Sequence, residues 1–547
     1  GQVCAVLSVL DDSMRKYWAL GFLSVVISTC LLLSLPVIRG YFIYGCGDVL
    51  THIGYMKDIE NYGTIGSNVY PILHILGFSL HGIAGLSFST ITMIVPPVFS
   101  LISILYWYVL GRELFADRPT LVVLVLIASL PMYGVVNSLF TPNHESFLVL
   151  PLILYCLISS QNPVKKGMMS VILVTLSILI VLFHPLIAII VMLIYALLYM
   201  SNILPISISA VRSHIGNTWM VLAIMAIVFS IWSTYLYALT NVLDPLISSI
   251  LGLEAGESQL MDQLASVKRV EAGALDLVKI GLLTYGLDVI FGLLALVCIL
   301  YLLVLYIKKE ITIPRFLLFS IVCFMAFFLL AVTIFFTINE FGYSRVYKIA
   351  RIFSLLIISS SVIVGYRNLQ NIRNLRKVAF CVLCCTSVVV VVLSVFTCHL
   401  SPAIIQMNQQ VPEGDYSGLA TFFEKRDDSI QILEYGASQL RFYDAIYGHS
   451  CPRVNVRYDS GDGGGLFPID HFGYNASFSL GSNYDGRRYF LLTKQGRDFY
   501  ENLYAEFPDE WRFMTQDFER LESDPSVILL YSNEGLDLYL INSFKNV

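Results

Sequence analysis

The sequence predicts a mainly α-helical, multi-pass membrane protein with about eleven transmembrane helices and a C-terminal soluble α/β domain on the outer face. Of its 547 residues, 56% are hydrophobic and only 13% are charged, and the mean hydropathy is +0.73. Because a soluble domain carries about 25% charged residues, this composition excludes a single water-soluble globule. The charge balance changes near residue 401, since the chain from there on holds 22 acidic and 12 basic side chains and the preceding part has a basic excess. The chain therefore divides into a basic membrane body, residues 1–400, and an acidic soluble domain, residues 401–547.

Long apolar stretches recur along the membrane body. A helix that crosses a bilayer needs about 20 apolar residues, and most of these stretches reach or approach that length. The stretch 168–200 is long enough for two crossings, and His184-Pro185 separates them. The predicted crossings are residues 17–38, 90–110, 119–137, 145–160, 168–183, 186–200, 217–239, 279–306, 315–337, 349–366 and 378–399.

Basic residues are spaced so that every second loop is positively charged. Cytoplasmic loops carry an excess of Lys and Arg, so Arg15 and Lys16 predict a cytoplasmic N-terminus. This topology puts residues 39–89 and 241–278 in long outer loops and the C-terminal domain on the outer side of a cell membrane. The loops predicted to be cytoplasmic contain Arg112, Arg118, Lys165, Lys166, Arg212, Lys308, Lys309, Arg315, Arg367, Arg373, Arg376 and Lys377.

Local patterns predict several elements on the outer side. Apolar residues recur at helical spacing over residues 49–59, which predicts an amphipathic helix in the first outer loop. Pro71 predicts the start of a second helix there, because proline is favoured in the first turn of a helix. In the C-terminal domain, residues 528–541 predict a β-hairpin that turns between Asn533 and Gly535.

Unusual polar residues collect on the outer side, beginning with Asp48. Ionisable groups at the edge of the hydrocarbon layer are costly and indicate function. A carboxylate at this place can take the proton of an acceptor hydroxyl as a general base, or it can be the N-cap of the following helix. His52 lies one helical turn further on the same face. It either shares a proton or a metal with Asp48 or is a plain interfacial histidine.

Further outer residues are predicted to line a substrate-binding cavity. Two of them have simpler alternative roles. Glu145 can place a favourable charge at a helix N-terminus, and His184 can mark only the break between two crossings. The candidates, in addition to His52, are Tyr70, His74, His144, Glu145 and His184.

Positive charges three residues apart mark the outer end of a later crossing, where the distribution of basic residues disfavours them. Guanidinium groups bind phosphate through two hydrogen bonds, so we interpret Arg345 and Arg351, with Lys348 between them, as a phosphate site. Snorkelling of these side chains to lipid headgroups is the alternative. Glu340 lies five residues before Arg345 and is included among the substrate-binding candidates.

These outer residues resemble those of the GT-C superfamily, glycosyltransferases that use polyprenyl-phosphate sugars. The resemblance lies in an aspartate in the first outer loop of a many-pass protein and in the spacing of the residues after it. The layout is also similar to oligosaccharyltransferase catalytic subunits and protein mannosyltransferases. The residues that carry the spacing are Asp48, His52, Tyr55, Ile59, Gly63, Tyr70, Pro71 and His74.

The resemblance implies a GT-C-like fold and an inverting membrane glycosyltransferase. Such an enzyme moves a sugar from a polyprenyl (dolichyl-type) phosphate donor to a lipid, glycan or protein acceptor on the outer face. It implies that Asp48 is the catalytic carboxylate and that Arg345 or Arg351 holds the lipid phosphate. No Asp-Glu or Asp-x-Asp pair stands at Asp48, so no metal ligands are predicted and a divalent metal, Mg or Mn, stays open. The tail sequence lacks a Trp-Trp-Asp-Tyr-Gly-type signature of oligosaccharyltransferases, which disfavours transfer to peptide asparagine.

Two other functional classes are alternatives. A lipid-linked oligosaccharide flippase or transporter carries charged residues near the middle of the membrane and paired halves, whereas the crossings here are nearly free of charge. An O-antigen-type polymerase would use a long arginine-rich outer loop, which residues 241–278 do not provide. The predicted partners are the lipid-linked donor, its acceptor and membrane lipids. No basic arm indicates nucleic acid.

Overall fold

The structure is a computed structural model. It describes residues 18–66, 68–131, 133–160, 162–203, 215–235, 274–337, 343–368, 373–453, 456, 467–505, 508 and 511–543. The predicted outer loop 241–278 lies mostly outside the described residues, and so does Glu340.

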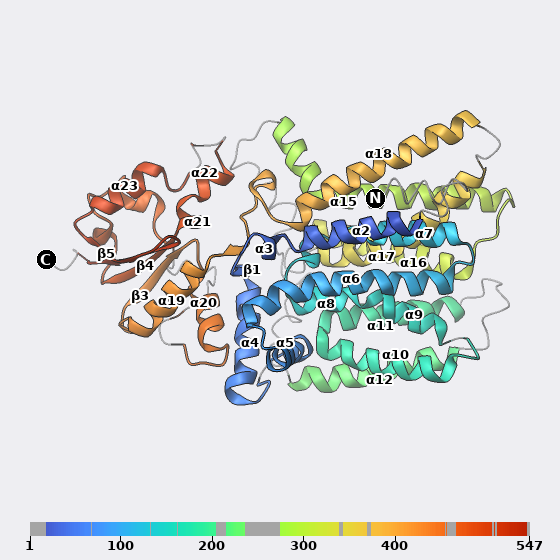
Figure 1. Ribbon diagram of the computed structural model, residues 1–547, viewed down its shortest axis with the longest axis horizontal. Helices are drawn as coiled ribbons and strands as arrows, with labels where there is room; N and C mark the ends of the chain where they lie inside the picture. Colours follow the sequence, from blue (N-terminus) through green and yellow to red (C-terminus); the bar gives the residue numbers. More distant parts are fainter. Residues whose placement is uncertain are drawn as a thin grey trace.

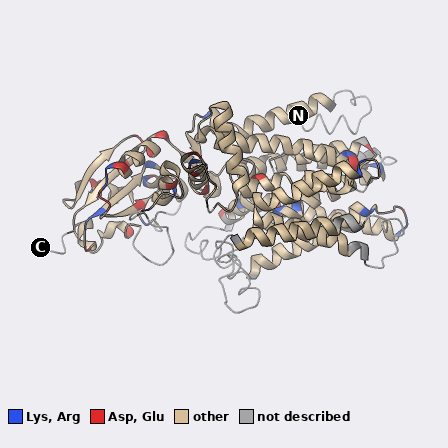
Figure 2. Cartoon of the chain, turned by 90° about the horizontal axis from the view of Figure 1, so that it is seen from below, with Lys and Arg blue, Asp and Glu red and all other residues tan. Residues whose placement is uncertain are grey.

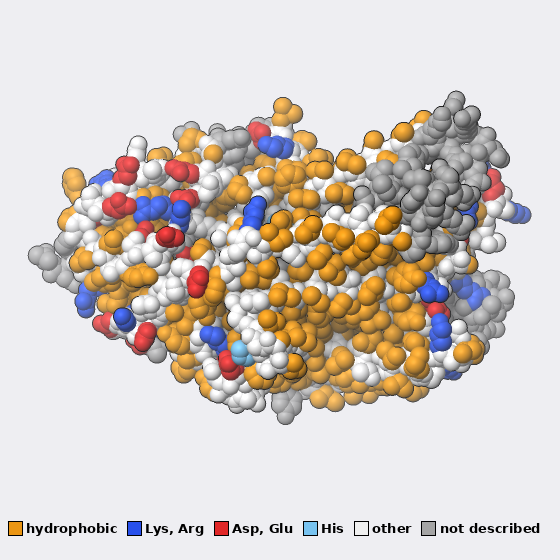
Figure 3. Space-filling view, viewed as in Figure 1, with side chains coloured by type: hydrophobic (Ala, Val, Ile, Leu, Met, Phe, Trp, Pro, Cys, Tyr) orange, Lys and Arg blue, Asp and Glu red, His pale blue; other side chains and the backbone are white. Residues whose placement is uncertain are grey.

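The larger part of the molecule is a bundle of helices that run side by side (Figure 1). Hydrophobic side chains cover most of the bundle surface seen in Figure 3, and few charged residues lie along its middle in Figure 2. The helices are α2 (Trp18–Leu33), α3 (Leu35–Ile38), α6 (Phe88–Leu114), α7 (Arg118–Ala128), α8 (Pro142–Leu148), α9 (Leu150–Ser159), α10 (Lys166–Phe183), α11 (Pro185–Ile203), α12 (Ile215–Tyr235), α15 (Ala274–Ile307), α16 (Arg315–Thr337), α17 (Tyr343–Asn368) and α18 (Arg373–Cys398).

Six helices of the described part are long and apolar enough to cross a membrane: α6, α10, α15, α16, α17 and α18. Shorter apolar helices cover Ala19–Leu33, Pro71–Ala84, Pro119–Ala128, Pro185–Met200 and Trp219–Thr234. The prediction of a multi-pass membrane protein is therefore confirmed, whereas the number of eleven crossings stays a prediction. The break at His184 is confirmed, since α10 ends at Phe183 and α11 begins at Pro185.

Helix α17 is the most buried of these six helices, since 78% of an apolar stretch of 18 residues within it is buried in the protein. It packs against α16, α15 and α7. Its serine hydroxyls donate to the carbonyl of the preceding turn, as Ser359 Oγ does to Leu355 O at 2.7 Å. Small residues of this kind let helix backbones approach closely in a membrane bundle.

The segment predicted as the first outer loop, residues 39–89, forms two helices, as predicted. Helix α4 spans Asp48–Tyr62 and α5 spans Pro71–Ala84, with Pro71 in its first turn. Helix α4 ends at Gly63, whose φ of 65° is the left-handed conformation that glycine adopts without strain. A short 3-10 helix, η2 (Gly134–Asn137), lies between α7 and α8.

The chain after α18 forms a four-stranded sheet with helices around it, at the left of Figure 1. The strand order is β3-β4-β6-β5, with β3 and β4 parallel and the other pairs antiparallel. Strands β5 and β6 form the predicted hairpin. The elements are η3 (Pro402–Ile404), β2 (Gln410–Val411), α19 (Glu413–Lys425), β3 (Gln431–Tyr435), α20 (Gln439–Tyr447), η4 (Asp470–Gly473), η5 (Leu480–Asn483), β4 (Arg488–Thr493), α21 (Lys494–Arg497), α22 (Phe499–Leu503), α23 (Thr515–Ser523), β5 (Val527–Ser532) and β6 (Leu536–Ile541).

Residues 39–89 connect the bundle to this C-terminal region. Strand β1 (Ile43–Tyr44) pairs antiparallel with β2, so that Ile43 lies opposite Val411. Helix α4 packs on α20, and Gly54 lies against the backbone carbonyl of Asp444. The start of α4 is therefore held between the two parts of the molecule.

Candidate active site

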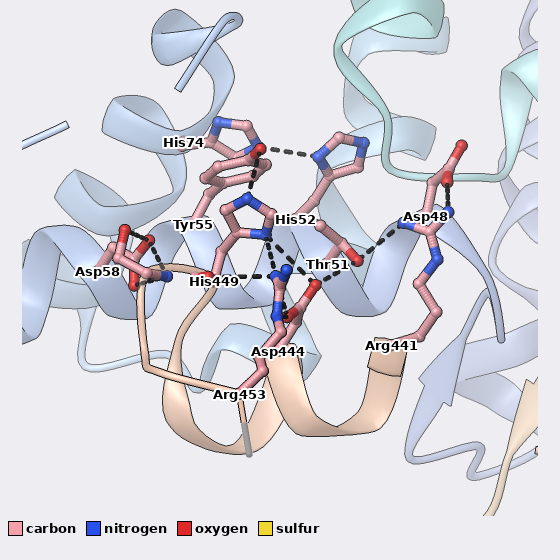
Figure 4. Close-up of polar contacts among 11 residues, drawn as sticks. Asp48, Thr51, His52, Tyr55, Asp58, His74, Arg441, Asp444, His449 and Arg453 are labelled. Carbon is pink, nitrogen blue, oxygen red and sulfur yellow. Dashed lines mark hydrogen bonds and ion pairs between the residues drawn. The ribbon is translucent and has the colours of Figure 1, made fainter. Parts of the chain in front are cut away.

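Asp48 is the first residue of α4, and its carboxylate faces α20. The N-cap of α4 is Gly47 and no side chain caps this end, so the N-cap alternative for Asp48 is wrong. Its Oδ1 lies 2.8 Å from Nη2 of Arg441, and 66% of the Asp48 side chain is exposed. The other carboxylate oxygen points away from Arg441 in Figure 4. Asp48 therefore combines a fixed position with an accessible oxygen.

Arg441 links Asp48 to a polar network between α4 and α20 (Figure 4). Its Nη1 donates to Thr51 Oγ1 at 2.9 Å, and Thr51 donates to Asp444 Oδ2 at 3.0 Å. Asp444 is buried and also accepts from Arg453 Nη2 at 2.6 Å. A buried carboxylate is stable when cations and hydroxyls satisfy its oxygens. This network fixes the start of α4 from the side of the C-terminal region.

Two buried imidazoles lie behind Asp48. His52 Nδ1 and His74 Nε2 are 3.0 Å apart, and His74 Nδ1 lies 2.7 Å from Nδ2 of Asn68. Burial lowers the pKa of His52 to about 4, although the charge of Asp48 acts in the opposite direction. Burial also holds the pKa of His74 well below its usual value. Both rings are therefore neutral at physiological pH, and His52 bonds to His74.

The rings of Tyr70 and His184 stack, and Tyr70 lies next to the ring of His52. The centroids of the two stacked rings are 5.2 Å apart with an angle of 5° between the planes. The pKa of His184 is lowered to about 3, first by burial and then by the positive charge of Arg345. His52 also contributes to this lowering. The ring of His184 is therefore within electrostatic reach of both His52 and Arg345.

His144 and Glu145 belong to the short helix α8. His144 Nδ1 donates to the carbonyl of Leu139 at 3.3 Å, and burial followed by the charge of Lys348 lowers the His144 pKa to about 3. Glu145 is fully buried, and its Oε2 accepts from the backbone N–H of Thr141 at 3.1 Å. Glu145 therefore does stabilise a helix N-terminus. Its Oε1 has no partner in the described part of the chain.

The cations of α17 occupy different environments. Arg345 is exposed, and Lys348 is half-buried. Arg351 is only 4% exposed and forms an ion pair with Asp288 of α15. Its guanidinium also lies 5.4 Å from the ring centroid of Tyr347. Arg345 is thus an exposed cation near the start of α17, whereas Arg351 is engaged within the bundle.

Sequence reasoning missed the residues that surround Asp48 and His52. Asn68 lies in a loop between two predicted helices, where a buried amide leaves no pattern. The residues from α20 and the loop after it lie in a segment of mixed polarity with no motif that ties it to Asp48. The missed residues are Thr51, Asn68, Arg441, Asp444, His449 and Arg453.

The described residues of this site form no metal cluster, and the cavity described below lies away from them. Among the residues that the structure describes, no three His, Cys, Asp or Glu side chains are grouped to hold a metal ion. A cavity of about 310 Å³ lies elsewhere, between the ends of α3 and α18 and the segment that follows α18. Its lining includes Arg39, Tyr41 and His399 but none of the predicted site residues.

In this chain a helical bundle packs against a C-terminal region with a mixed sheet, and Asp48 begins the helix that lies between them. The structure is similar to the crystal structure of the oligosaccharyltransferase from Archaeoglobus fulgidus in complex with Zn and sulfate, with a TM-score of 0.52 and 14% sequence identity. That likeness covers 77% of this chain and 61% of the archaeal one, so the chain spans about three fifths of the length of this relative.

A second structure resembles the whole chain more loosely. It is ArnT from Cupriavidus metallidurans bound to undecaprenyl phosphate, with a TM-score of 0.47 and 11% identity over 96% of this chain and 98% of that one. No family model and no curated protein matches the sequence. The GT-C fold predicted from the sequence is therefore confirmed by the archaeal structure.

Proposed function

We propose that this protein is a membrane glycosyltransferase that moves a sugar from a polyprenyl (dolichyl-type) phosphate donor to an acceptor on the outer face. Asp48 is the general base that takes the proton of the acceptor nucleophile. The single observation that carries the proposal is the accessible Asp48 carboxylate, placed at the start of α4 next to His52. The GT-C fold supports this class of reaction. An inverting outcome is expected.

The leaving phosphate needs positive charge on the far side of the site. Arg345 is exposed at the start of α17, and its charge reaches His184. Lys348 similarly acts on His144. A leaving phosphate develops negative charge, and fixed cations stabilise that charge most effectively where water is scarce. We assign the lipid phosphate to Arg345 and Lys348, with Tyr70, His144 and His184 around it.

The proposed orientation follows the distribution of basic loops. The N-terminus is cytoplasmic, and the region 401–547 is an extracytoplasmic domain. In this orientation α4, α5 and α20 lie together on the outer side. The contact between α4 and α20 supports a shared site at that level, because both helices contribute to the surroundings of Asp48.

The test is sugar transfer by Asp48→Asn in purified protein with a radiolabelled polyprenyl-phosphate sugar. Asparagine keeps the shape but cannot accept the proton, so transfer should fall at least about 10²-fold. Glu60→Gln is the matched control, because Glu60 is an acid on the same helix, 44% exposed and 3.4 Å from His81. It should leave transfer unchanged.

Other outcomes identify the alternatives. Full transfer by Asp48→Asn would remove Asp48 from the mechanism. Turnover of a polyprenyl-diphosphate glycan but not of the monophosphate sugar would indicate a polymerase. Movement of the lipid-linked glycan across vesicles without any transfer would indicate a flippase.

A further inference from the structure

Asn68, His74 and His52 form one buried hydrogen-bonded row that ends at the candidate active site. Asn68 is 1% and His74 is 0% exposed. The Asn68 amide lies 2.7 Å from His74 Nδ1, and His74 Nε2 lies 3.0 Å from His52 Nδ1. Three residues from α4, α5 and the loop between them are thus connected through four consecutive polar atoms.

Asn68 sets the donor-to-acceptor direction of the hydrogen bonds in this row. The backbone N–H of Tyr70 donates to Asn68 Oδ1 at 2.9 Å. A backbone N–H cannot accept, so this bond assigns the oxygen of the Asn68 amide. The atom that faces His74 is therefore Nδ2, which only donates. In this bond we assign His74 Nδ1 as the acceptor; the His74 ring also has a hydrogen bond to the backbone of Tyr70.

Each later bond follows from the one before it. A neutral imidazole has one donor and one acceptor nitrogen, and burial keeps both rings neutral. Since His74 accepts at Nδ1, its proton is on Nε2 and is donated to His52 Nδ1. The single proton of neutral His52 is then on Nε2. In the described part of the chain, no hydrogen bond to His52 Nε2 is found, and this atom is on the side of the ring away from His74.

We propose that Asn68 and His74 are positioning residues that hold His52 as a neutral Nε2–H donor to a substrate oxygen. His52 lies within electrostatic reach of both Asp48 and His184, so this oxygen lies between the base and the cationic side of the site. The identity of the substrate rests on the proposed function. The tautomer of His52 does not rest on the proposed function, because it is a property of the protein without substrate.

The test is ¹⁵N-histidine NMR of the full-length protein in lipid nanodiscs. The chain has nine histidines, and loss of one signal pair in His52→Asn identifies His52. We expect Nε2 protonated and Nδ1 unprotonated. Asn68→Asp should reverse the row, because a carboxylate accepts from both the Tyr70 N–H and a His74 Nδ1–H. His52 would then carry its proton on Nδ1, and sugar transfer should fall on the order of 10²-fold in kcat, with KM little changed.

Asn162→Asp is the matched control, because Asn162 Oδ1 accepts from the backbone N–H two residues later, as Asn68 does, but at 3.1 Å in the loop between α9 and α10. It should change neither the tautomer nor the rate. A wild-type His52 protonated on Nδ1 would overturn the proposal, even if Asn68→Asp failed to fold. A reversed tautomer with unchanged transfer would overturn the donor role. Absence of sugar transfer in the wild type would refute the proposed function and leave the tautomer assignment to the NMR result.

Discussion

Arg441 Nη2 lies 2.8 Å from Asp48 Oδ1, and this ion pair joins α20 to the first residue of α4. Asp48 follows the first hydrophobic helix of the bundle, whereas Arg441 belongs to the region after the last one. Arg441 also donates to Thr51 at 2.9 Å, which gives its guanidinium two fixed partners on one helix. The position of the proposed base therefore depends on the C-terminal region.

Arg441→Ala should reduce kcat for sugar transfer about tenfold or more, because it releases both Asp48 and Thr51. Arg441→Lys should have an intermediate rate, since an ammonium group cannot form the two-pronged contact of a guanidinium. Steady-state kinetics with saturating donor measure this effect. Arg512→Ala is the control, because Arg512 pairs with Asp470 at an exposed site of the same region and such pairs contribute about 0–1 kcal/mol. Equal rates for Arg441→Ala and Arg512→Ala would show that Arg441 does not position the base.

Gly54→Ala should loosen the contact between α4 and α20. A Cβ at Gly54 would lie 2.6 Å from the carbonyl oxygen of Asp444, and such overpacking costs about 1–3 kcal/mol. The gain in helix propensity, about 0.5–1 kcal/mol, is smaller. The unfolding midpoint and the transfer rate should therefore both fall.

Gly82→Ala is the control for that substitution. Gly82 lies inside α5, and a Cβ there meets nothing within 4 Å. It should keep activity and raise the midpoint slightly, because only the propensity term changes. A destabilisation as large as that of Gly54→Ala would contradict the steric argument.

Arg345 and Arg351 should respond differently to removal. Arg345→Ala should raise KM for the lipid-linked donor about tenfold without unfolding, because an exposed phosphate ligand is lost.

Arg351→Ala should destabilise the protein by about 3–5 kcal/mol, because it leaves Asp288 uncompensated within the bundle. Thermal unfolding and donor titration separate the two effects. A stable Arg351→Ala variant with a raised donor KM would instead assign the phosphate to Arg351. Asp288→Ala combined with Arg351→Ala should recover part of the stability.

Asp415→Asn should remove the loss of folding stability that the wild type shows as the pH rises. Burial raises the pKa of Asp415 from 3.8 to about 7, so the folded protein binds this proton more tightly than the unfolded chain does. The stabilisation is complete at pH values below 3.8 and is lost as the pH rises toward and through 7. At pH 8 the variant should be more stable than the wild type by about 2 kcal/mol after allowance for solvent screening, and near pH 4 the two should agree.

Unfolding midpoints of the purified protein across this pH range measure the difference. Glu519→Gln is the control, because Glu519 is an exposed acid in α23 of the same region. It should leave the pH profile unchanged. A constant offset between Asp415→Asn and the wild type at every pH would exclude the titration of Asp415 as the cause.

Local sequence patterns were enough to predict most of the helical elements. The spacing of apolar residues located α4, Pro71 located the start of α5, and His184-Pro185 located the break between α10 and α11. These features are set by hydropathy and backbone chemistry within a few residues. The same local reasoning identified Asp48 as the unusual acid but kept the N-cap alternative, because a single aspartate before a helix satisfies both patterns.

The sequence by itself determined that this chain has a membrane-embedded helical body, that its unusual polar groups collect at the ends of certain helices, and that Asp48 is the leading candidate base. Only the tertiary structure decided which groups surround that acid. It brought Arg441 into an ion pair with Asp48 and Arg351 into one with Asp288. It also joined Asn68, His74 and His52 by hydrogen bonds. The physical reason is that hydropathy and turn chemistry act along the chain. The partner, burial and protonation of a polar group depend instead on packing between segments that are distant in the sequence.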